Sequence, residues 1–112
     1  MGDASDPVID LTVIIPVYNS ERYLPKALES VLEQKGVAIE IIVVNDGSTG
    51  KCRDIVDEYR AKHKNIHYLS HDRNEGLFRA RLTGSNAANG RYLAFLDSHG
   101  YVSMCLLITP EA

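Results

Sequence analysis

The sequence predicts an α/β domain, a three-layer sandwich in which helices cover a mostly parallel sheet with strand order 3-2-1-4. Four short apolar runs alternate with three stretches whose apolar residues recur at helical spacing, and this alternation is typical of βαβ units. The runs are apolar almost throughout, as in strands that helices bury on both faces. Because parallel crossovers are right-handed, few topologies remain, and we expect half of a doubly wound sheet.

Bulk composition indicates one globular domain. The 112 residues carry a net charge of -3 and are 45% hydrophobic, so we expect a flexible lead-in over residues 1–10 and a single domain over 11–112. The scattered basic residues predict no nucleic-acid partner. No run is long enough for a transmembrane segment, and the acidic start is not a signal peptide. With two cysteines at no metal-binding spacing, we expect a cytoplasmic protein; association with the periphery of a membrane stays open.

The first βα unit occupies residues 11–36. Residues 11–17 (LTVIIPV) form the first predicted strand, which ends near Pro16 because proline cannot donate to a sheet. Ser20 is a plausible N-cap of the following helix, but Pro25 fits only in a first turn, so a later start of the regular helix stays open; Gly36 is a suitable stop. The helical spacing is set by the apolar residues Tyr23, Leu24, Ala27, Leu28, Val31 and Leu32.

The second unit begins with a strand over residues 40–44 (EIIVV) and a polar loop over 45–49 (NDGST). A second amphipathic helix follows, with Cys52, Ile55, Val56 and Tyr59 on its apolar face. A weaker third strand is expected over residues 66–70.

A third helix is predicted over residues 77–88, and a fourth strand over 92–96. Small residues recur every four positions along this helix, which predicts a close approach to the sheet. They are Gly76, Ala80, Gly84 and Ala88. Asn89-Gly90 ends the helix. Residues 103–112 support no firm prediction.

Polar residues follow three of the predicted strands. In the order 3-2-1-4 the topological switch lies between the first and fourth strands, and ligands bind outside the carboxyl ends there. The polar clusters after these strands are residues 16–19 and 97–99, and the cluster at 45–48 lies next to them. Strand order alone therefore brings three polar loops to one crevice.

Several familiar phosphate-binding and catalytic motifs are absent from the sequence. The first strand is followed by no G-x-G-x-x-G, and the chain has neither a P-loop nor a nucleophile elbow. Tyr18 could stack on a base, and Asp46 could accept from a ring N–H. Asp97 and His99 would share one face of an extended strand and could hold a divalent cation that neutralises a diphosphate. Taken alone, D-x-H is more often a polar loop.

Three segments together resemble a known family. VIIPVYNSERYLPKALESVL, EIIVVNDGST and NEGLFRARLTGSNAANGRYLAFLDS are similar to the nucleotide-sugar half of glycosyltransferase family 2. The resemblance covers about residues 12–100. It implies a GT-A, Rossmann-like nucleotide-diphospho-sugar transferase fold, a UDP-sugar donor and Mn²⁺ or Mg²⁺. It also implies transfer to a hydroxyl of a saccharide, lipid-linked or peptide acceptor, as in polysaccharide biosynthesis.

The resemblance also implies roles for individual residues in the nucleotide pocket. Pro16, Val17 and Tyr18 would line the pocket for uracil and ribose. Glu21 would lie at the edge of this pocket, and Asp46 would recognise the uracil ring. Gly76 would open the third helix beside the site, and Arg81 would contact the nucleotide or support the metal loop. Simpler interpretations stay open. Tyr18 could be a half-buried loop aromatic, Asp46 a cap of the second helix, Arg81 a solvated charge and Glu21 a first-turn acid.

Asp97, Ser98 and His99 occupy the position of the family's D-x-D motif, so Asp97 and His99 are the implied metal ligands and catalytic residues. The family usually has a second aspartate where this chain has His99. D-x-H is instead the pattern of the polypeptide N-acetylgalactosaminyltransferases, which GLFRARLTG and FLDSH also resemble. Neutral imidazole remains a suitable ligand for Mn²⁺-like ions. The two groups differ in stereochemical outcome, so the resemblance leaves inversion and retention open.

Members of the family carry an acceptor-binding half after the D-x-D strand, and residues 101–112 do not resemble one. We therefore expect a domain that ends before the acceptor-binding half. The alternative to a transferase is a non-catalytic module of the same fold that binds a nucleotide or a protein partner.

Overall fold

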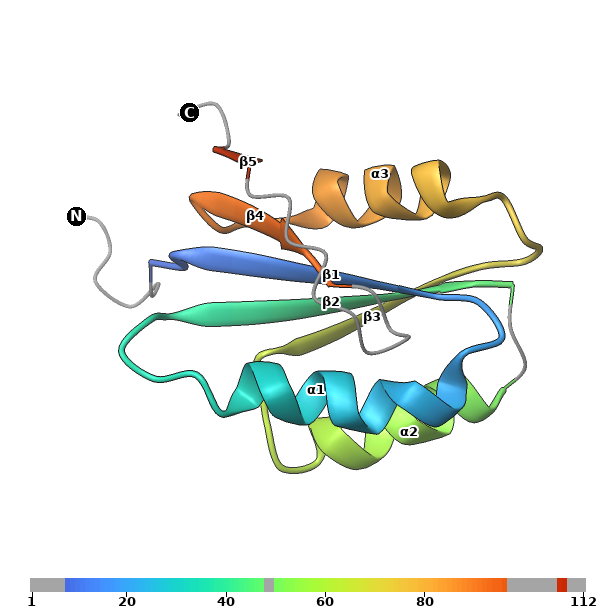
Figure 1. The fold of residues 1–112 in the computed structure, drawn as a ribbon, viewed down its shortest axis with the longest axis horizontal. Coiled ribbons are helices and arrows are strands. Elements are labelled where there is room, and N and C mark those ends of the chain that lie inside the picture. The colour runs from blue at the N-terminus through green and yellow to red at the C-terminus, as the bar shows by residue number, and fades with distance from the viewer. Residues whose placement is uncertain (1–7, 48–49, 97–106, 109–112) are drawn as a thin grey trace.

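The computed structural model describes residues 8–47, 50–96 and 107–108. Its strands and helices alternate along the chain (Figure 1), and the four strands and three helices predicted from the sequence are all present. The elements are β1 (Leu11–Val17), the 3-10 helix η1 (Glu21–Tyr23), α1 (Leu24–Leu32), β2 (Ile39–Asp46), α2 (Lys51–Arg60), β3 (Ile66–His71), α3 (Leu77–Ala87), β4 (Tyr92–Phe95) and β5 (Leu107–Ile108).

The sheet has the order β3-β2-β1-β4-β5. The first four strands are parallel, which confirms the predicted order 3-2-1-4. In the centre of the sheet Ile14 pairs with Ile42 of β2 and Phe95 of β4. The short β5 pairs antiparallel with β4 and was not predicted. Helices α1 and α2 cover one face of the sheet and α3 covers the other (Figure 1), so the three-layer architecture is also confirmed.

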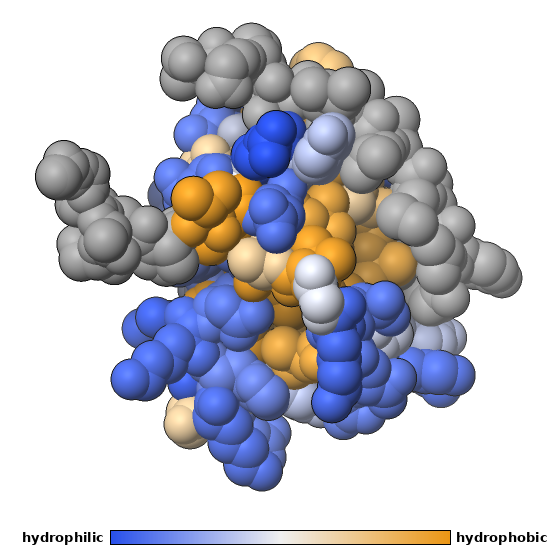
Figure 2. All heavy atoms as spheres, turned by 90° about the vertical axis from the view of Figure 1, so that its left-hand side faces the viewer, coloured by the Kyte–Doolittle hydropathy of each residue, from blue (hydrophilic) through white to orange (hydrophobic). Residues whose placement is uncertain are grey.

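Each face of the sheet has its own core because side chains alternate along β1. Val13, Ile15 and Val17 pack in the larger cluster with α1 and α2, whereas Ile14 packs in the cluster that includes Ala80 of α3. Both clusters consist mainly of buried aliphatic residues, as the continuous apolar runs predict. In Figure 2, which shows the end of the molecule at the left of Figure 1, hydrophobic residues gather in the middle and hydrophilic residues lie mainly below them.

Helix α3 lies close to the sheet, as its small residues predict. Ala80 is fully buried. A methyl group on Gly84 would lie 2.5 Å from Cγ2 of Ile14 and 3.3 Å from Cγ2 of Val44. The spacing of small residues thus sets how closely α3 packs on β1 and β2.

Two details of the prediction were wrong. Ser20 was a plausible cap of the first helix, but the 3-10 helix η1 intervenes and the Ser20 side chain makes no capping hydrogen bond. Helix α1 begins at Leu24, with Pro25 in its first turn, which is the later start that Pro25 left open. Strand β2 extends through Asn45 and Asp46, which were assigned to a loop. The strand continues because both residues pair in register with the end of β3, where Asp46 lies opposite His71.

Glu40 of β2 anchors the turn between α3 and β4 on the face of the sheet that α3 covers. Its Oε2 atom accepts hydrogen bonds from the Thr12 hydroxyl at 2.7 Å and the Asn89 amide at 2.6 Å. The Gly90 amide in turn donates to the Thr12 hydroxyl. Burial by itself would raise the pKa of Glu40, but the hydrogen bonds from Thr12 and Asn89 outweigh it and leave the pKa below its ordinary value of 4.5.

We expect Glu40→Gln to lower the free energy of unfolding by about 2 kcal/mol at neutral pH, because buried charge-assisted hydrogen bonds are lost. A folded-state pKa below 4.5 means that this contribution is complete above pH 4.5 and disappears as the pH falls through the folded pKa. Urea unfolding of both proteins at stepwise lower pH should therefore show the difference shrinking in acid. The exposed Glu33→Gln is the control, and equal stabilities of the Glu40 variant and the unmodified protein at pH 7 would contradict the prediction.

In the part of the chain that the structure describes, none of the helices has the length and apolar character needed to cross a membrane.

Candidate functional site

A pocket of about 310 Å³ opens at the carboxyl ends of β1, β2 and β4, against the amino-terminal half of α3. The switch between β1 and β4 lies at this edge, where the order of the strands predicts a ligand site. The predicted site residues that line it are Pro16, Val17, Tyr18, Asp46, Gly76 and Arg81. Residues distant in the sequence thus converge on one pocket.

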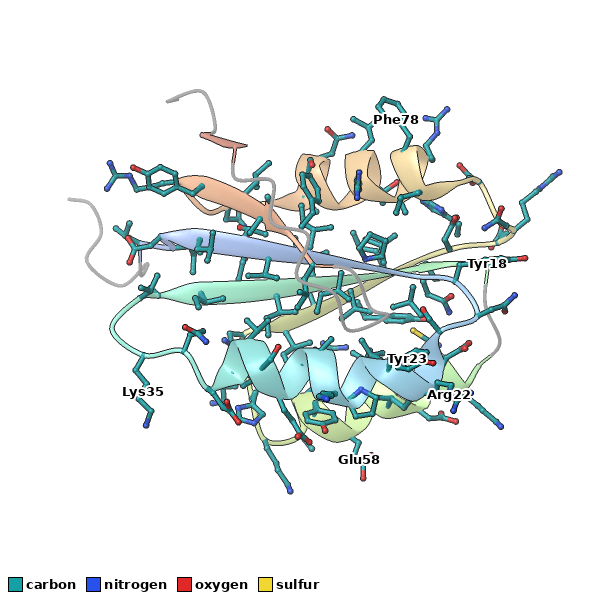
Figure 3. The ribbon with its side chains drawn as sticks, viewed as in Figure 1. Tyr18, Arg22, Tyr23, Lys35, Glu58 and Phe78 are labelled. Atoms are coloured by element: carbon teal, nitrogen blue, oxygen red, sulfur yellow. The ribbon has the colours of Figure 1, made fainter. Side chains whose placement is uncertain are left out.

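The loop after β1 presents Tyr18 at the rim. The Tyr18 side chain is 48% exposed and lies at the carboxyl end of β1, at the opposite end of the molecule from Lys35 (Figure 3). The chain turns sharply after it, since Asn19 adopts a φ of 54°. A half-exposed ring beside a pocket with an apolar wall is suited to stacking on a planar ligand.

Asp46 is buried in the pocket wall, and its carboxylate is held by four protein donors. Oδ1 accepts from Nδ1–H of His71 and from the Glu75 amide, each at 2.8 Å. Oδ2 accepts from the Asn74 side-chain amide and from the Gly76 amide, each at 2.9 Å. Burial would raise the pKa of Asp46, but these hydrogen bonds, led by that of His71, lower it below 3.8. The group is therefore ionised at neutral pH.

The alternative in which Asp46 caps the second helix is wrong. Gly50 precedes α2 and supplies no side-chain cap, whereas Asp46 binds the amides of Glu75 and Gly76 at the start of α3. Two acceptor positions are available on each carboxylate oxygen, so the four donors fill them. A ligand N–H reaches Asp46 only by sharing or replacing one of these bonds.

Arg81 faces the pocket from α3. Its guanidinium carbon lies 5.4 Å from the centre of the Phe95 ring, a cation–π distance. Its Nε atom is buried and has no hydrogen-bond partner among the described residues. Arg81 is only partly exposed, which disfavours a fully solvated helix charge, and a buried N–H in a protein ordinarily has a polar partner.

One predicted site residue does not line this pocket, and three others lie outside the described residues. Glu21 begins η1 and does not line the pocket. Burial raises the pKa of Cys52 to about 12, and the charge of Glu21 adds to this rise. Asp97, Ser98 and His99 lie outside the described residues, as does Cys105. The residues that are described contain no group of three or more His, Cys, Asp or Glu side chains able to hold a metal ion.

The sequence matches the model of glycosyl transferase family 2 over residues 12–107. The chain belongs to glycosyltransferase family 2. Glycosyltransferase GlyA of Streptococcus pneumoniae is 45% identical over 92 residues, which cover 82% of this chain and 13% of GlyA. The uncharacterized glycosyltransferase EpsJ of Bacillus subtilis is 38% identical over 104 residues, or 91% of this chain and 30% of EpsJ. The chain therefore spans less than a third of either relative.

Solved structures confirm the GT-A fold. S. aureus TarS in complex with UDP superimposes with a TM-score of 0.75 at 33% identity, over 81% of this chain and 28% of that chain. A second TarS structure, with UDP-GlcNAc, gives the same score and identity. The pocket of this family 2 domain thus lies in a fold that it shares with a protein solved in complex with UDP and with UDP-GlcNAc.

Sequence reasoning missed three residues that shape the pocket of this glycosyltransferase domain. Asn74 and His71 bind Asp46 directly, and Thr83 binds the other nitrogen of His71. The polar end of the third strand was a usable signal for His71, because it continues IHYLS and lies beside the second strand. No local pattern identified Thr83 on its helix.

Proposed function

We propose that this domain binds a UDP-sugar together with a divalent cation and serves glycosyl transfer to an acceptor hydroxyl. The observation that carries the proposal is the pocket at the carboxyl ends of β1, β2 and β4, with an exposed aromatic ring at its rim and a buried arginine N–H without a protein partner among the described residues. The UDP and UDP-GlcNAc complexes of the 33% identical TarS support it. The sugar and the acceptor, whether saccharide, lipid-linked or peptide, are not specified by this pocket.

Within the pocket we assign the base to the space between Tyr18 and Asp46, with Pro16 and Val17 as its wall. Tyr18 would stack on uracil, and Asp46 would accept from uracil N3–H. Asn74, which donates to Oδ2 of Asp46, is exposed. The hydrogen bond between Asn74 and Asp46 is therefore the one that a ligand could most readily replace or share. Glu21 would stand at the outer edge of the base site.

Across the pocket, Gly76 opens α3 and Arg81 extends from its second turn. The Arg81 guanidinium would pair with the diphosphate, which supplies the anionic partner that its buried Nε lacks among the described residues.

Asp97 and His99 are the proposed ligands and catalytic residues for Mn²⁺ or Mg²⁺, with Ser98 between them. Asp97 directly follows Leu96, which lines the pocket. One carboxylate and one neutral imidazole fit a Mn²⁺-like ion, although two ligands leave positions for the diphosphate and water. When bound, the ion acts as a Lewis acid that stabilises the departing diphosphate.

We expect UDP to bind in preference to ADP and GDP, because the pocket offers an acceptor to a pyrimidine imide. Thermal unfolding of the chain with each nucleotide, with and without Mn²⁺, measures this. At a hundredfold excess over Kd, binding adds about 2.7 kcal/mol to stability. Equal shifts with the three nucleotides would contradict uracil recognition. Selective binding without multiple-turnover sugar transfer by the full-length protein would favour the alternative of a non-catalytic nucleotide-binding module.

We expect Mn²⁺ and UDP to tighten each other's binding by the same factor, since the proposed ion touches both Asp97 and the diphosphate. His99→Ala should remove most of this coupling. His99→Asp should keep it and make it less dependent on pH near neutrality, because only neutral histidine coordinates a metal. Calorimetry of UDP binding with and without Mn²⁺ measures the coupling. Unchanged coupling in His99→Ala would exclude His99 as a ligand.

A further inference from the structure

We propose that His71 and Thr83 are positioning residues that hold the Asp46 carboxylate in one orientation and thereby set the preference of the pocket for uracil over cytosine. We call the hydrogen-bonded set Asp46, His71 and Thr83 the His71 bridge. The inference rests on the proposed function, since it concerns how the same pocket reads its base.

The bridge joins three elements of the fold. His71 ends β3, and its Nδ1 atom lies 2.8 Å from Oδ1 of Asp46 at the end of β2. Its Nε2 atom lies 2.8 Å from the hydroxyl of Thr83 on α3. The side chains of His71 and Asp46 are only 10% and 2% exposed. Neither His71 nor Thr83 lines the pocket, so both act on a ligand only through Asp46.

The proton on Nδ1 of His71 can be assigned from its partner. An ionised carboxylate only accepts, so Nδ1 of His71 carries the proton that it donates to Asp46. The Thr83 hydroxyl can donate to Nε2 or accept from it, so the second hydrogen bond forms with either state of the ring. With both nitrogens engaged, the imidazole cannot turn without losing both hydrogen bonds.

The two carboxylate oxygens of Asp46 have partners on different sides of the pocket wall. The partners of Oδ1 are His71 and Glu75, and neither lines the pocket. The partners of Oδ2 are Asn74 and Gly76, and both line it. The His71 bridge therefore fixes Oδ1 behind the wall and leaves Oδ2 as the oxygen on the ligand side.

An acceptor fixed at that position distinguishes two pyrimidines. Uracil carries a hydrogen on N3 and can donate it to Oδ2, whereas N3 of cytosine is itself an acceptor and is repelled by a carboxylate. The ratio of UDP to CDP affinity thus reports the orientation of Asp46. A general disruption of the pocket would weaken the binding of both nucleotides equally and leave the ratio of their affinities unchanged.

The test is calorimetric binding of UDP and CDP to the full chain and its variants. His71→Phe keeps a ring but removes both nitrogens, and Thr83→Val removes the hydroxyl at constant volume. We expect each to lower the UDP:CDP ratio, about tenfold for His71→Phe, the scale of one charge-assisted hydrogen bond. Thr83→Ser, which keeps the hydroxyl, should retain most of the preference. His67→Phe is the matched control, because His67 lies on the same strand and contacts Glu40 instead.

The outcomes separate the two proposals. If the unmodified chain does not prefer UDP, the proposed uracil site is wrong. If the unmodified chain prefers UDP, two results would overturn the positioning role. Either His71→Phe and Thr83→Val both keep the full UDP:CDP affinity ratio, or both variants lose affinity for the two nucleotides equally. If His71→Phe shows no cooperative unfolding transition, the comparison of Thr83→Val with Thr83→Ser decides, since it changes one hydroxyl on a partly exposed helix position.

Discussion

Replacing Asp46 by alanine is expected to lower the free energy of unfolding by about 3 kcal/mol or more, since each buried donor left without a partner costs about 1–3 kcal/mol. The donors that lose their acceptor are the His71 ring, the Asn74 side chain and the amides of Glu75 and Gly76. The start of α3 also loses the negative charge that its dipole favours. UDP affinity should fall with stability, by about 1.5–3 kcal/mol for a charge-assisted hydrogen bond.

Urea unfolding and UDP calorimetry measure these losses. Because the folded pKa of Asp46 lies below its ordinary value of 3.8, the stability from its charge is complete above pH 3.8 and is lost as the pH falls through the folded pKa. Asp54→Ala, an exposed acid in the first turn of α2, is the control and should change stability by less than about 0.5 kcal/mol. Equal stabilities of the two variants would contradict a structural role for Asp46.

Gly47→Ala is expected to lower the free energy of unfolding by about 2–5 kcal/mol, the sum of about 1–2 kcal/mol for a left-handed residue and about 1–3 kcal/mol for overpacking. Gly47 has a φ of +84°, and a Cβ there would lie 2.6 Å from the carbonyl carbon of Arg73 and 2.9 Å from Cα of Asn74. Both obstacles are backbone, so they cannot move aside as a side chain can. Relief would require displacing the loop that carries Asn74 over the pocket.

Two other glycines distinguish the cost of a left-handed backbone from the cost of steric overlap at the new Cβ. Gly36 has a similar φ of +83° but nothing within 4 Å of its Cβ position, so Gly36→Ala should cost only the conformational part. Gly50 has open space and an ordinary φ of -67°, so Gly50→Ala should be close to neutral. Thermal and urea unfolding of the three variants measures the series. A Gly47→Ala variant no less stable than Gly36→Ala would mean that the loop yields easily.

The architecture was predictable from the sequence because it depends on local periodicity. Continuous aliphatic runs such as residues 11–17 are stable only where helices cover both faces of a sheet, and right-handed crossovers then leave few strand orders. The same order predicts that the ends of β1, β2 and β4 meet, which brings Tyr18 and Asp46 to one pocket. The spacing of Ala80 and Gly84 predicts the close packing of α3 for the same reason.

What Asp46 does in the pocket was decided only by tertiary structure. Its side-chain partners lie 25–30 residues further along the chain, and the register of β2 with β3 determines that His71 lies opposite it. No local pattern reports a hydrogen bond of that separation, so the sequence indicated an acid near a ligand but not the four donors around it. The two-residue β5 was missed for a related reason, since so short a strand exists only through its pairing with β4. Periodic burial is encoded locally, whereas the partners of a buried charge depend on how distant strands are aligned.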